Sequence, residues 1–90
     1  MKLDWDEGKR RKTFEARGLD FARCEEVFAG PKFEYLDIRK DYGEDRWITV
    51  GLLEMSMVFV VWTERGEITW IISMRHATPD ERETYGKQLY

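Results

Sequence analysis

The fold is decided by residues 46–75, which read RWITVGLLEMSMVFVVWTERGEITWIISMR. This stretch contains three runs, residues 46–53, 57–64 and 68–75, that are rich in β-branched and aromatic side chains and are separated by short polar or glycine-containing connections. Residues 33–39 have the same character. The pattern predicts four strands in an antiparallel meander.

Helical signals precede most of the predicted strands. Residues 9–17 lack any internal helix breaker and end at Gly18, the residue type best able to adopt a left-handed C-terminal cap. Asp20 is placed to cap a second helix over residues 21–28, which stops before the Gly-Pro pair that follows it. The sequence therefore predicts two short helices ahead of the sheet.

A third helix is predicted at the end of the chain. Residues 78–81 place a capping threonine, a proline at the first helical position and a glutamate where a capping box needs it. Residues 3–5 alternate apolar and polar side chains and predict an optional short strand. The expected fold class is α+β, with two N-terminal helices, an antiparallel four-stranded sheet that the short N-terminal strand can extend, and a C-terminal helix, with the helices packed on one face of the sheet.

Length and composition fit one small domain over residues 1–90. The chain carries 15 Lys and Arg against 18 Asp and Glu, and its net charge of −3 argues against a protein that coats nucleic acid through bulk charge. No apolar run approaches the roughly 18 residues of a membrane span, and the N-terminus has no stretch suited to a signal peptide, so we expect a cytoplasmic protein. Cys24 and His76 are too few soft ligands for a zinc site, and no metal or other cofactor is expected.

The hairpin between the last two strands sets the expected faces of the sheet. A two-residue turn at residues 65–66 would pair Val61 with Trp70 and Phe59 with Ile72. The expected core face comprises Met57, Phe59, Val61, Trp70, Ile72 and Met74 with Leu36, Ile38, Ile48, Val50 and Leu52. The opposite face comprises Tyr35, Asp37, Arg39, Trp47, Thr49, Gly51, Val58, Val60, Trp62, Glu64, Thr69, Ile71, Ser73 and Arg75.

This opposite face interleaves aromatic rings with arginines, a combination that stacks single-stranded bases while guanidinium groups hold phosphates. RNA cleavage through the 2′-hydroxyl needs cations to stabilise the crowded phosphorane and groups that move protons to and from the reacting oxygens. The candidates are four arginines for charge, three proton-transfer groups and two tryptophans for base stacking. The arginines are Arg39, Arg46, Arg65 and Arg75, and the proton-transfer groups are Glu64, His76 and Tyr85. The tryptophans are Trp47 and Trp62. The alternative is that these charges are ordinary strand-end and surface groups.

The densest basic patch is the run Lys9-Arg10-Arg11-Lys12 in the first predicted helix. Such a run is usually a solvated helical face. In a chain of acidic balance it is also suited to steering RNA, with Lys9 and Arg10 as the RNA-contacting pair, or to binding a partner protein. These interpretations stay open at the level of sequence.

The order of short motifs along the chain resembles the BrnT family of toxins from type II toxin–antitoxin systems. The matching pieces run over nearly the whole chain in the family's order. They are Trp5-Asp6-x-x-Lys9, Gly18-Leu19-x-Phe21 followed by Glu26-Val27-Phe28, residues 46–51, residues 60–66, Ile71-Ile72-Ser73-Met74-Arg75-x-Ala77 and Glu81-Arg82-x-x-Tyr85.

The resemblance implies a RelE-like fold and a metal-independent endoribonuclease that cleaves RNA to inhibit translation and growth. It also implies a BrnA-like antitoxin with a DNA-binding ribbon-helix-helix, so that the toxin reaches operator DNA only indirectly through the antitoxin. The arginines that it carries over by position are Arg46, Arg65 and Arg75.

Three positions depart from the family's pattern. Ala16-Arg17-Gly18 stands where relatives commonly have Lys-His-Gly, Thr13 replaces a common Asn, and Trp70 stands where an Arg often precedes Ile-Ile-Ser. The alternative function is therefore a catalytically weakened toxin homologue that acts as a non-enzymatic interaction or operon co-repressor module.

The last two strands are apolar on both faces, whereas the predicted helices cover one face. We therefore expect Val58, Val60, Trp62 and Ile71 to be accessible and an antitoxin to bury them in direct competition with RNA. The alternative is that the terminal helix covers this patch and that the antitoxin binds the basic first helix.

Overall fold

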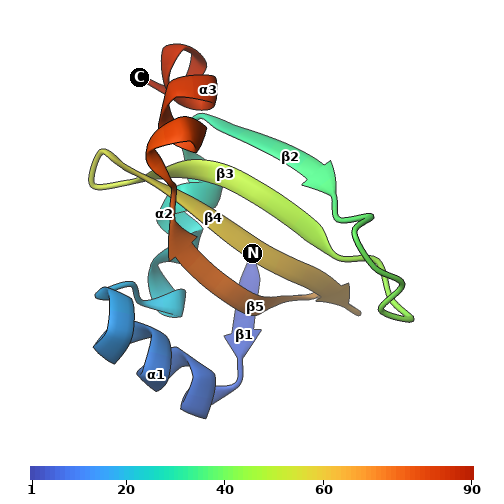
Figure 1. Ribbon diagram of the computed structural model, residues 1–90. Coiled ribbons are helices and arrows are strands. Elements are labelled where there is room, and N and C mark those ends of the chain that lie inside the picture. The colour runs from blue at the N-terminus through green and yellow to red at the C-terminus, as the bar shows by residue number, and fades with distance from the viewer.

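The computed structural model describes residues 1–90, which form a five-stranded sheet and its covering helices (Figure 1). The elements are β1 (Lys2–Trp5), α1 (Glu7–Arg17), the 3-10 turn η1 (Phe21–Arg23), α2 (Cys24–Ala29), β2 (Lys32–Leu36), β3 (Trp47–Leu53), β4 (Ser56–Arg65), β5 (Ile68–His76) and α3 (Pro79–Leu89). The strand order is β1-β5-β4-β3-β2, with β1 parallel to β5 and all other neighbours antiparallel. The predicted α+β class is confirmed, and the optional N-terminal strand is present.

Local capping explains where the N-terminal helices begin and end. Asp6 accepts a hydrogen bond from the backbone N–H of Lys9 and begins α1, and Gly18 ends it in the left-handed conformation, with φ +69°. Asp20 accepts a hydrogen bond from the N–H of Ala22. The second predicted helix is confirmed, although it forms as the 3-10 turn η1 that continues into the six-residue helix α2.

The predicted capping box at the start of α3 is present. The Thr78 side chain accepts a hydrogen bond from the Glu81 N–H at 3.2 Å, and the Glu81 carboxylate accepts one from the Thr78 N–H at 2.8 Å. These bonds satisfy two backbone donors that a helix start leaves without an intrahelical partner. Helix α3 therefore begins at a fixed point shortly after β5.

The β4–β5 hairpin has a different register from the predicted one. Its loop is residues 66–67, because the glycine, with φ +61°, takes the first loop position, as in a type II′ turn. Arg65 consequently pairs with Ile68. A bulge opposite Val61 and Trp62 shifts the register once more.

These shifts replace the predicted pairs, Val61 with Trp70 and Phe59 with Ile72. Trp70 pairs with Thr63, and Phe59 pairs with Arg75. Cross-strand partners lie on the same face of a sheet, and a one-residue slip moves every side chain to the other face. The prediction that Phe59 and Arg75 lie on opposite faces is therefore wrong.

Helices cover both faces of the sheet, which corrects the prediction of a single covered face. On one face, η1 and α2 pack against the strands and enclose a core of 10 buried residues. On the other face, α3 lies across one end of the sheet (Figure 1). The first core comprises Leu19, Phe21, Cys24, Val27, Phe28, Leu53, Val58, Val60, Ile71 and Met74, and the second comprises Ile48, Val50, Met57, Phe59, Ala77 and Leu89.

The apolar patch that was expected to be accessible lies within the first core. Val58 and Val60 are 0% exposed and Ile71 is 1% exposed, since η1 and α2 cover them. The half-buried Trp62 ring contacts the Phe28 ring of α2 edge to face, with 5.6 Å between the centroids. An antitoxin could not reach this patch without unpacking the N-terminal core. Both the predicted patch and the alternative that the terminal helix covers it are therefore wrong.

Helix α2 lies close to β3 because of Gly51. A Cβ atom at this position would come within 2.7 Å of Cγ1 of Val27 and within 3.4 Å of two backbone oxygens. Any larger residue would push α2 away from the sheet, so the glycine fixes the distance between these elements.

Candidate functional site

A groove lies on the α3 side of the sheet, between the end of β2 and the first turn of α3. It has a volume of about 370 Å³ and an apolar floor from β3 and β4. Charged side chains from the segment after β2, from β5 and from α3 surround this floor. The lining includes Tyr35, Asp37, Arg39, Ile48, Phe59, Val61, Arg75 and Glu81.

Arg75 is held in a fixed orientation in this groove. Its Nη1 and Nη2 atoms donate to the two carboxylate oxygens of Glu81 at 2.7 and 2.9 Å, and its guanidinium lies over the Phe59 ring, 4.3 Å from the centroid. The hydrogen bonds from Arg75, with a further one from the Thr78 N–H, lower the pKa of Glu81 to about 2. The Arg75 side chain is still 41% exposed, so a phosphate can reach it.

A second guanidinium lies at the rim of the groove. Arg39 donates from Nε and Nη2 to Asp37 at 2.8 and 2.7 Å, and the Asp37 side chain is only 1% exposed. Hydrogen bonds from the side chain and the backbone of Arg39 lower the pKa of Asp37 to about 2. Arg39 itself is 67% exposed, so its remaining N–H groups are open to an anion.

Replacing Asp37 with asparagine should make the protein less sensitive to acid. A carboxylate whose pKa is lower in the folded chain stabilises the fold above its unfolded pKa, about 3.9 for aspartate. This stabilisation is lost as the pH falls through the folded pKa of about 2. Urea denaturation between about pH 5 and pH 2 should therefore show a steeper fall in unfolding free energy for the wild type than for Asp37→Asn. Parallel curves would mean that the Asp37–Arg39 pair does not stabilise the fold.

Two tyrosines lie beside each other near the groove, Tyr35 on β2 and Tyr85 on α3. Tyr85 of α3 packs on Phe33 and Phe59, with centroid distances of 5.3 and 6.0 Å. Tyr35 lines the groove and is partly exposed. Burial raises the pKa of Tyr35, and the neighbouring Tyr85 phenol and Glu81 carboxylate raise it further. Tyr35 is therefore a weaker acid than a free tyrosine and keeps its proton at neutral pH.

Arg46 and Arg65 come together at the far end of the sheet. Glu44 accepts a hydrogen bond from Nε of Arg46 at 3.2 Å and lies 3.8 Å from Nη2 of Arg65. The Arg65 guanidinium lies over the Trp70 ring, 4.5 Å from the centroid. Trp70, one of the departures from the family pattern, thus supports an arginine here.

This second pair of arginines is well separated from Arg75. Arg65 lies over Trp70, which pairs with Thr63, whereas Arg75 lies over its own partner Phe59. Thr63 and Phe59 are four residues apart on β4, which corresponds to about 13 Å. The structure therefore does not bring Arg65 and Arg75 to the same phosphate, although alternation places both on one face of the sheet.

Four other predicted side chains lie outside the groove. Trp47 and Trp62 stack on each other on the α2 side of the sheet, with centroids 6.2 Å apart. Glu64 is two residues from Trp62 on β4 and so faces the same side. His76 has its Nε2 atom 3.0 Å from the carbonyl oxygen of Arg17, at the end of α1. None of the four lines the groove.

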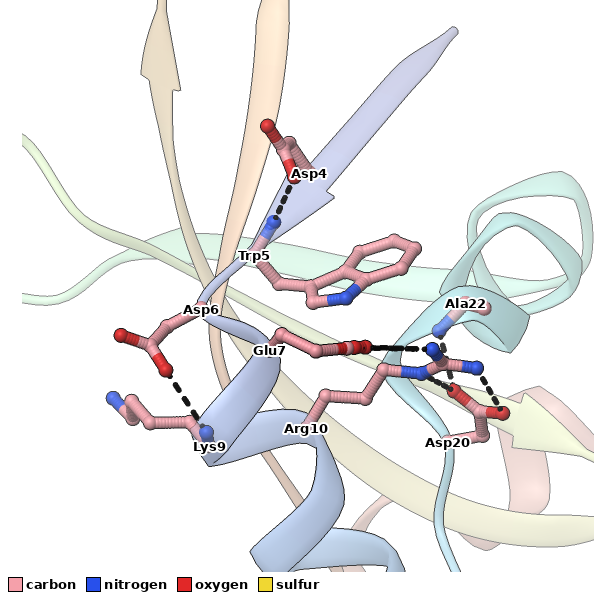
Figure 2. Close-up of polar contacts among 8 residues, drawn as sticks. All are labelled: Asp4, Trp5, Asp6, Glu7, Lys9, Arg10, Asp20 and Ala22. Atoms are coloured by element: carbon pink, nitrogen blue, oxygen red, sulfur yellow. Dashed lines mark hydrogen bonds and ion pairs between the residues drawn. The ribbon is translucent and has the colours of Figure 1, made fainter.

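The two residues of α1 that were predicted to bind RNA differ in their contacts, since Arg10 forms ion pairs and Lys9 does not. Figure 2 shows Arg10 beside the Trp5 ring, 5.4 Å from its centroid, and between Glu7 and Asp20. Arg10 donates to Asp20 at 2.8 and 3.1 Å and to Glu7 at 2.7 Å, which ties α1 to the turn before η1. Lys9 is exposed and forms no ion pair.

Sequence reasoning missed Glu81 and Tyr35 as site residues. The capping-box pattern accounts for Glu81 as a helix cap and does not indicate its second role as the partner of Arg75. One feature of the sequence could have indicated the contact between Glu81 and Arg75. A carboxylate lies in the first turn of a helix, and the strand before that helix carries an arginine near its end. For Tyr35, the strand pattern predicted the face opposite Ile48, whereas Tyr35 pairs with Ile48 and lines the groove beside it.

The thiol of Cys24 is not available for nucleophilic catalysis. It is buried, and this burial raises its pKa to about 12. A thiol with such a pKa has almost no thiolate at neutral pH. No three His, Cys, Asp or Glu side chains come together in a cluster that could hold a metal ion.

The structure contains no membrane-spanning helix, since none of its helices is long and apolar enough to cross a bilayer.

Comparison with known families agrees with the order of motifs in the sequence. The family described as "Ribonuclease toxin, BrnT, of type II toxin-antitoxin system" matches residues 5–81, from the end of β1 into the first turn of α3. This range includes every side chain that lines the groove. A search of curated proteins found no match. The chain therefore belongs to the BrnT family of ribonuclease toxins of type II toxin–antitoxin systems, which implies an RNA substrate and a cognate antitoxin.

Proposed function

We propose that this toxin is a metal-independent endoribonuclease and that its RNA substrate binds in the groove beside α3. The observation that carries the proposal is the Arg75 guanidinium, fixed between the Phe59 ring and the Glu81 carboxylate and still open to solvent. RNA cleavage concentrates negative charge on the phosphorane. A cation that is already oriented toward this charge lowers the barrier by about 3 kcal/mol.

In the reaction we propose, the 2′-oxygen of one nucleotide attacks the adjacent phosphorus and the 5′-oxygen of the next nucleotide leaves. Arg75 and Arg39 offset the charge of the phosphorane. The 2′ proton passes to water, and Tyr35 protonates the leaving oxygen, with Tyr85 beside it to hold it in place. The products are a 2′,3′-cyclic phosphate and a 5′-hydroxyl.

The other predicted residues have supporting parts in this proposal. Arg46 and Arg65 contact the RNA strand beyond the scissile nucleotide, because they are distant from Arg75 on the sheet. Lys9, exposed on α1, contributes to electrostatic steering. Glu64, His76, Trp47 and Trp62 lie outside the groove and take no direct part in the reaction.

Removal of metal ions should leave cleavage unchanged. Guanidinium groups supply the positive charge that a metal ion would otherwise supply, so excess EDTA should change the rate by less than about twofold. Cleavage of a short RNA can be followed by gel electrophoresis, and mass spectrometry of the products should identify the cyclic phosphate. Loss of activity in EDTA that Mg²⁺ restores would contradict metal independence.

The partner we propose is a BrnA-like antitoxin with a ribbon-helix-helix, acting with the toxin in the cytoplasm. Its toxin-binding segment covers the groove and pairs acidic side chains with Arg39 and Arg75, so that it excludes RNA directly. Ile38, 83% exposed at the edge of the groove, supplies an apolar contact next to these cations. DNA contact then comes only through the antitoxin, in keeping with the toxin's net charge of −3.

Replacing Ile38 with glutamate should weaken antitoxin binding by at least about tenfold, because it puts a charge into an apolar contact and repels acidic side chains. Calorimetry with the purified antitoxin would measure the affinity. Phe14→Glu is the matched control, since Phe14 is 55% exposed on α1 and distant from the groove. A large loss for Phe14→Glu with none for Ile38→Glu would place the antitoxin on α1 instead.

A catalytically weakened homologue is the second candidate function. It is favoured by two of the three departures from the family pattern, because their side chains have structural partners: Arg17 donates to the Met74 carbonyl at 2.8 Å, and Trp70 lies under Arg65. A folded protein that binds the antitoxin but leaves RNA intact would support this function. Rapid RNA cleavage would exclude it.

A further inference from the structure

We propose that Glu81 is a positioning residue for RNA cleavage, which holds one edge of the Arg75 guanidinium so that the other edge is presented to the scissile phosphate. This inference rests on the proposed function and adds to it a residue that no motif assigns to the reaction. Glu81 is not a catalytic residue in this account, because it touches Arg75 and not the RNA.

The hydrogen bonds of Arg75 leave a defined edge free. Nη1 and Nη2 donate to Glu81 at 2.7 and 2.9 Å, and Nη1 also lies 3.2 Å from the His76 carbonyl oxygen. No protein acceptor takes the N–H of Nε or the second N–H of Nη2. These two parallel donors form the side edge of the guanidinium, and such a pair matches two oxygens of a phosphate.

Two further contacts fix the plane of this edge. The Phe59 ring lies against the face of the guanidinium, 4.3 Å away, and Phe59 pairs directly with Arg75 across the sheet. Glu81 in turn is fixed by the Thr78 N–H, which donates to the same Oε1 atom that Nη1 contacts. The start of α3 is thereby coupled to the orientation of Arg75.

The geometry argues against two other roles for Glu81. As a proton acceptor it would need a pKa near neutral, whereas the bonds from Arg75 and Thr78 stabilise its charged form. A glutamate that inhibited the site by occupying the place of the phosphate would need to cover the whole guanidinium of Arg75, whereas its Nε side remains open. Positioning is the role that uses all of the contacts.

The test compares Glu81→Ala, Glu81→Gln and Thr78→Ala in cleavage of a short RNA. Misplacement of a reacting group by about 1 Å costs up to about 100-fold in rate, so we expect kcat to fall about 100-fold for Glu81→Ala and about 10-fold for Glu81→Gln, which keeps one acceptor. KM should change by less than about threefold. Thr78→Ala removes the hydroxyl that accepts from the Glu81 N–H but keeps the backbone N–H that holds the Glu81 carboxylate, so it should lower the melting temperature while leaving kcat near wild type.

The pH dependence separates positioning from proton transfer. Glu81→Gln should lower the rate equally at every pH, whereas loss of a general base would remove the acidic limb of the profile. A double-variant cycle with Arg75→Ala, measured as kcat for cleavage of the short RNA, should show that Glu81→Ala has no further effect once Arg75 is absent.

The inference is overturned if both Glu81 variants retain wild-type kcat, if either cleaves faster, or if Thr78→Ala loses as much kcat as Glu81→Ala. In those cases Arg75→Ala still tells whether the proposed function holds. An inactive Arg75→Ala beside an active Glu81→Ala would refute the role of Glu81 alone, whereas an active Arg75→Ala would refute the proposed site.

Discussion

Alanine in place of Arg75 should lower kcat for RNA cleavage by about 10²- to 10³-fold, with a smaller change in KM. This is the largest effect on activity that we expect from any single substitution. Arg75 lies on a rigid strand, and its guanidinium is oriented by Phe59 and Glu81 before RNA binds. The charge therefore needs no reorganisation at the moment when the phosphorane forms.

Arg75→Lys should also be impaired, because lysine keeps the charge but has no planar fork to span Glu81 and a phosphate together. Arg11→Ala, at an exposed arginine of α1, is the control that should cleave like the wild type. Arg65→Ala should mainly raise KM, since Arg65 lies beyond the scissile nucleotide in our account. Wild-type cleavage by a folded Arg75→Ala protein would refute the assignment of this residue.

Phe21→Ala should destabilise the protein by about 3–5 kcal/mol, the largest effect on stability that we expect. The Phe21 ring is 0% exposed and lies in the core that η1 and α2 form with the sheet. Its removal leaves a cavity where η1 and α2 pack on the sheet, so the N-terminal segment should detach first.

Phe14→Ala is the matched control for this prediction, because the same ring is removed from a position that is 55% exposed on α1. Its effect should stay within about 0.5 kcal/mol. Urea denaturation followed by tryptophan fluorescence measures both variants. Equal losses of stability for the two variants would contradict the packing of η1 on the sheet.

The sequence predicted the helices and the four antiparallel strands well because their signals are local, whereas the parallel pairing of β1 with β5 was not predicted. Gly18 ends α1 and the box of Thr78 and Glu81 begins α3 through contacts within a few residues. Such contacts depend on backbone conformation that the residue types themselves prefer. The motif order likewise predicted the family correctly, since it spans the chain.

The faces of the sheet could not be predicted in the same way. Strands β4 and β5 carry apolar side chains on both faces, so periodicity alone did not distinguish a core face from an open one. The choice then depended on a turn that was placed one residue too early, at Arg65 instead of Gly66. The bulge in the hairpin shifted the register of β4 and β5 a second time, and no residue type in the sequence indicates this bulge.

The same error determined which site residues were found. Arg75 and Arg39 are groove residues in the structure, and they were selected for their charge. Trp47 and Trp62 were grouped with them through the wrong register and lie on the opposite side. Glu81 was missed because its ion pair joins a helix to a strand. A contact between two such elements produces no periodic pattern of residue types in the sequence.

The central claim is that RNA binds in the groove between β2 and α3, and an NMR titration with a short 2′-O-methyl RNA tests it most directly. This RNA lacks the nucleophilic hydroxyl, so it binds without being cleaved. We predict that the largest shifts fall on Tyr35, Arg39 and Phe59 and on the Nε–H signal of Arg75, with little change on α2. Shifts concentrated on α1 and α2, with the Arg75 Nε–H signal unmoved at saturation, would contradict the account.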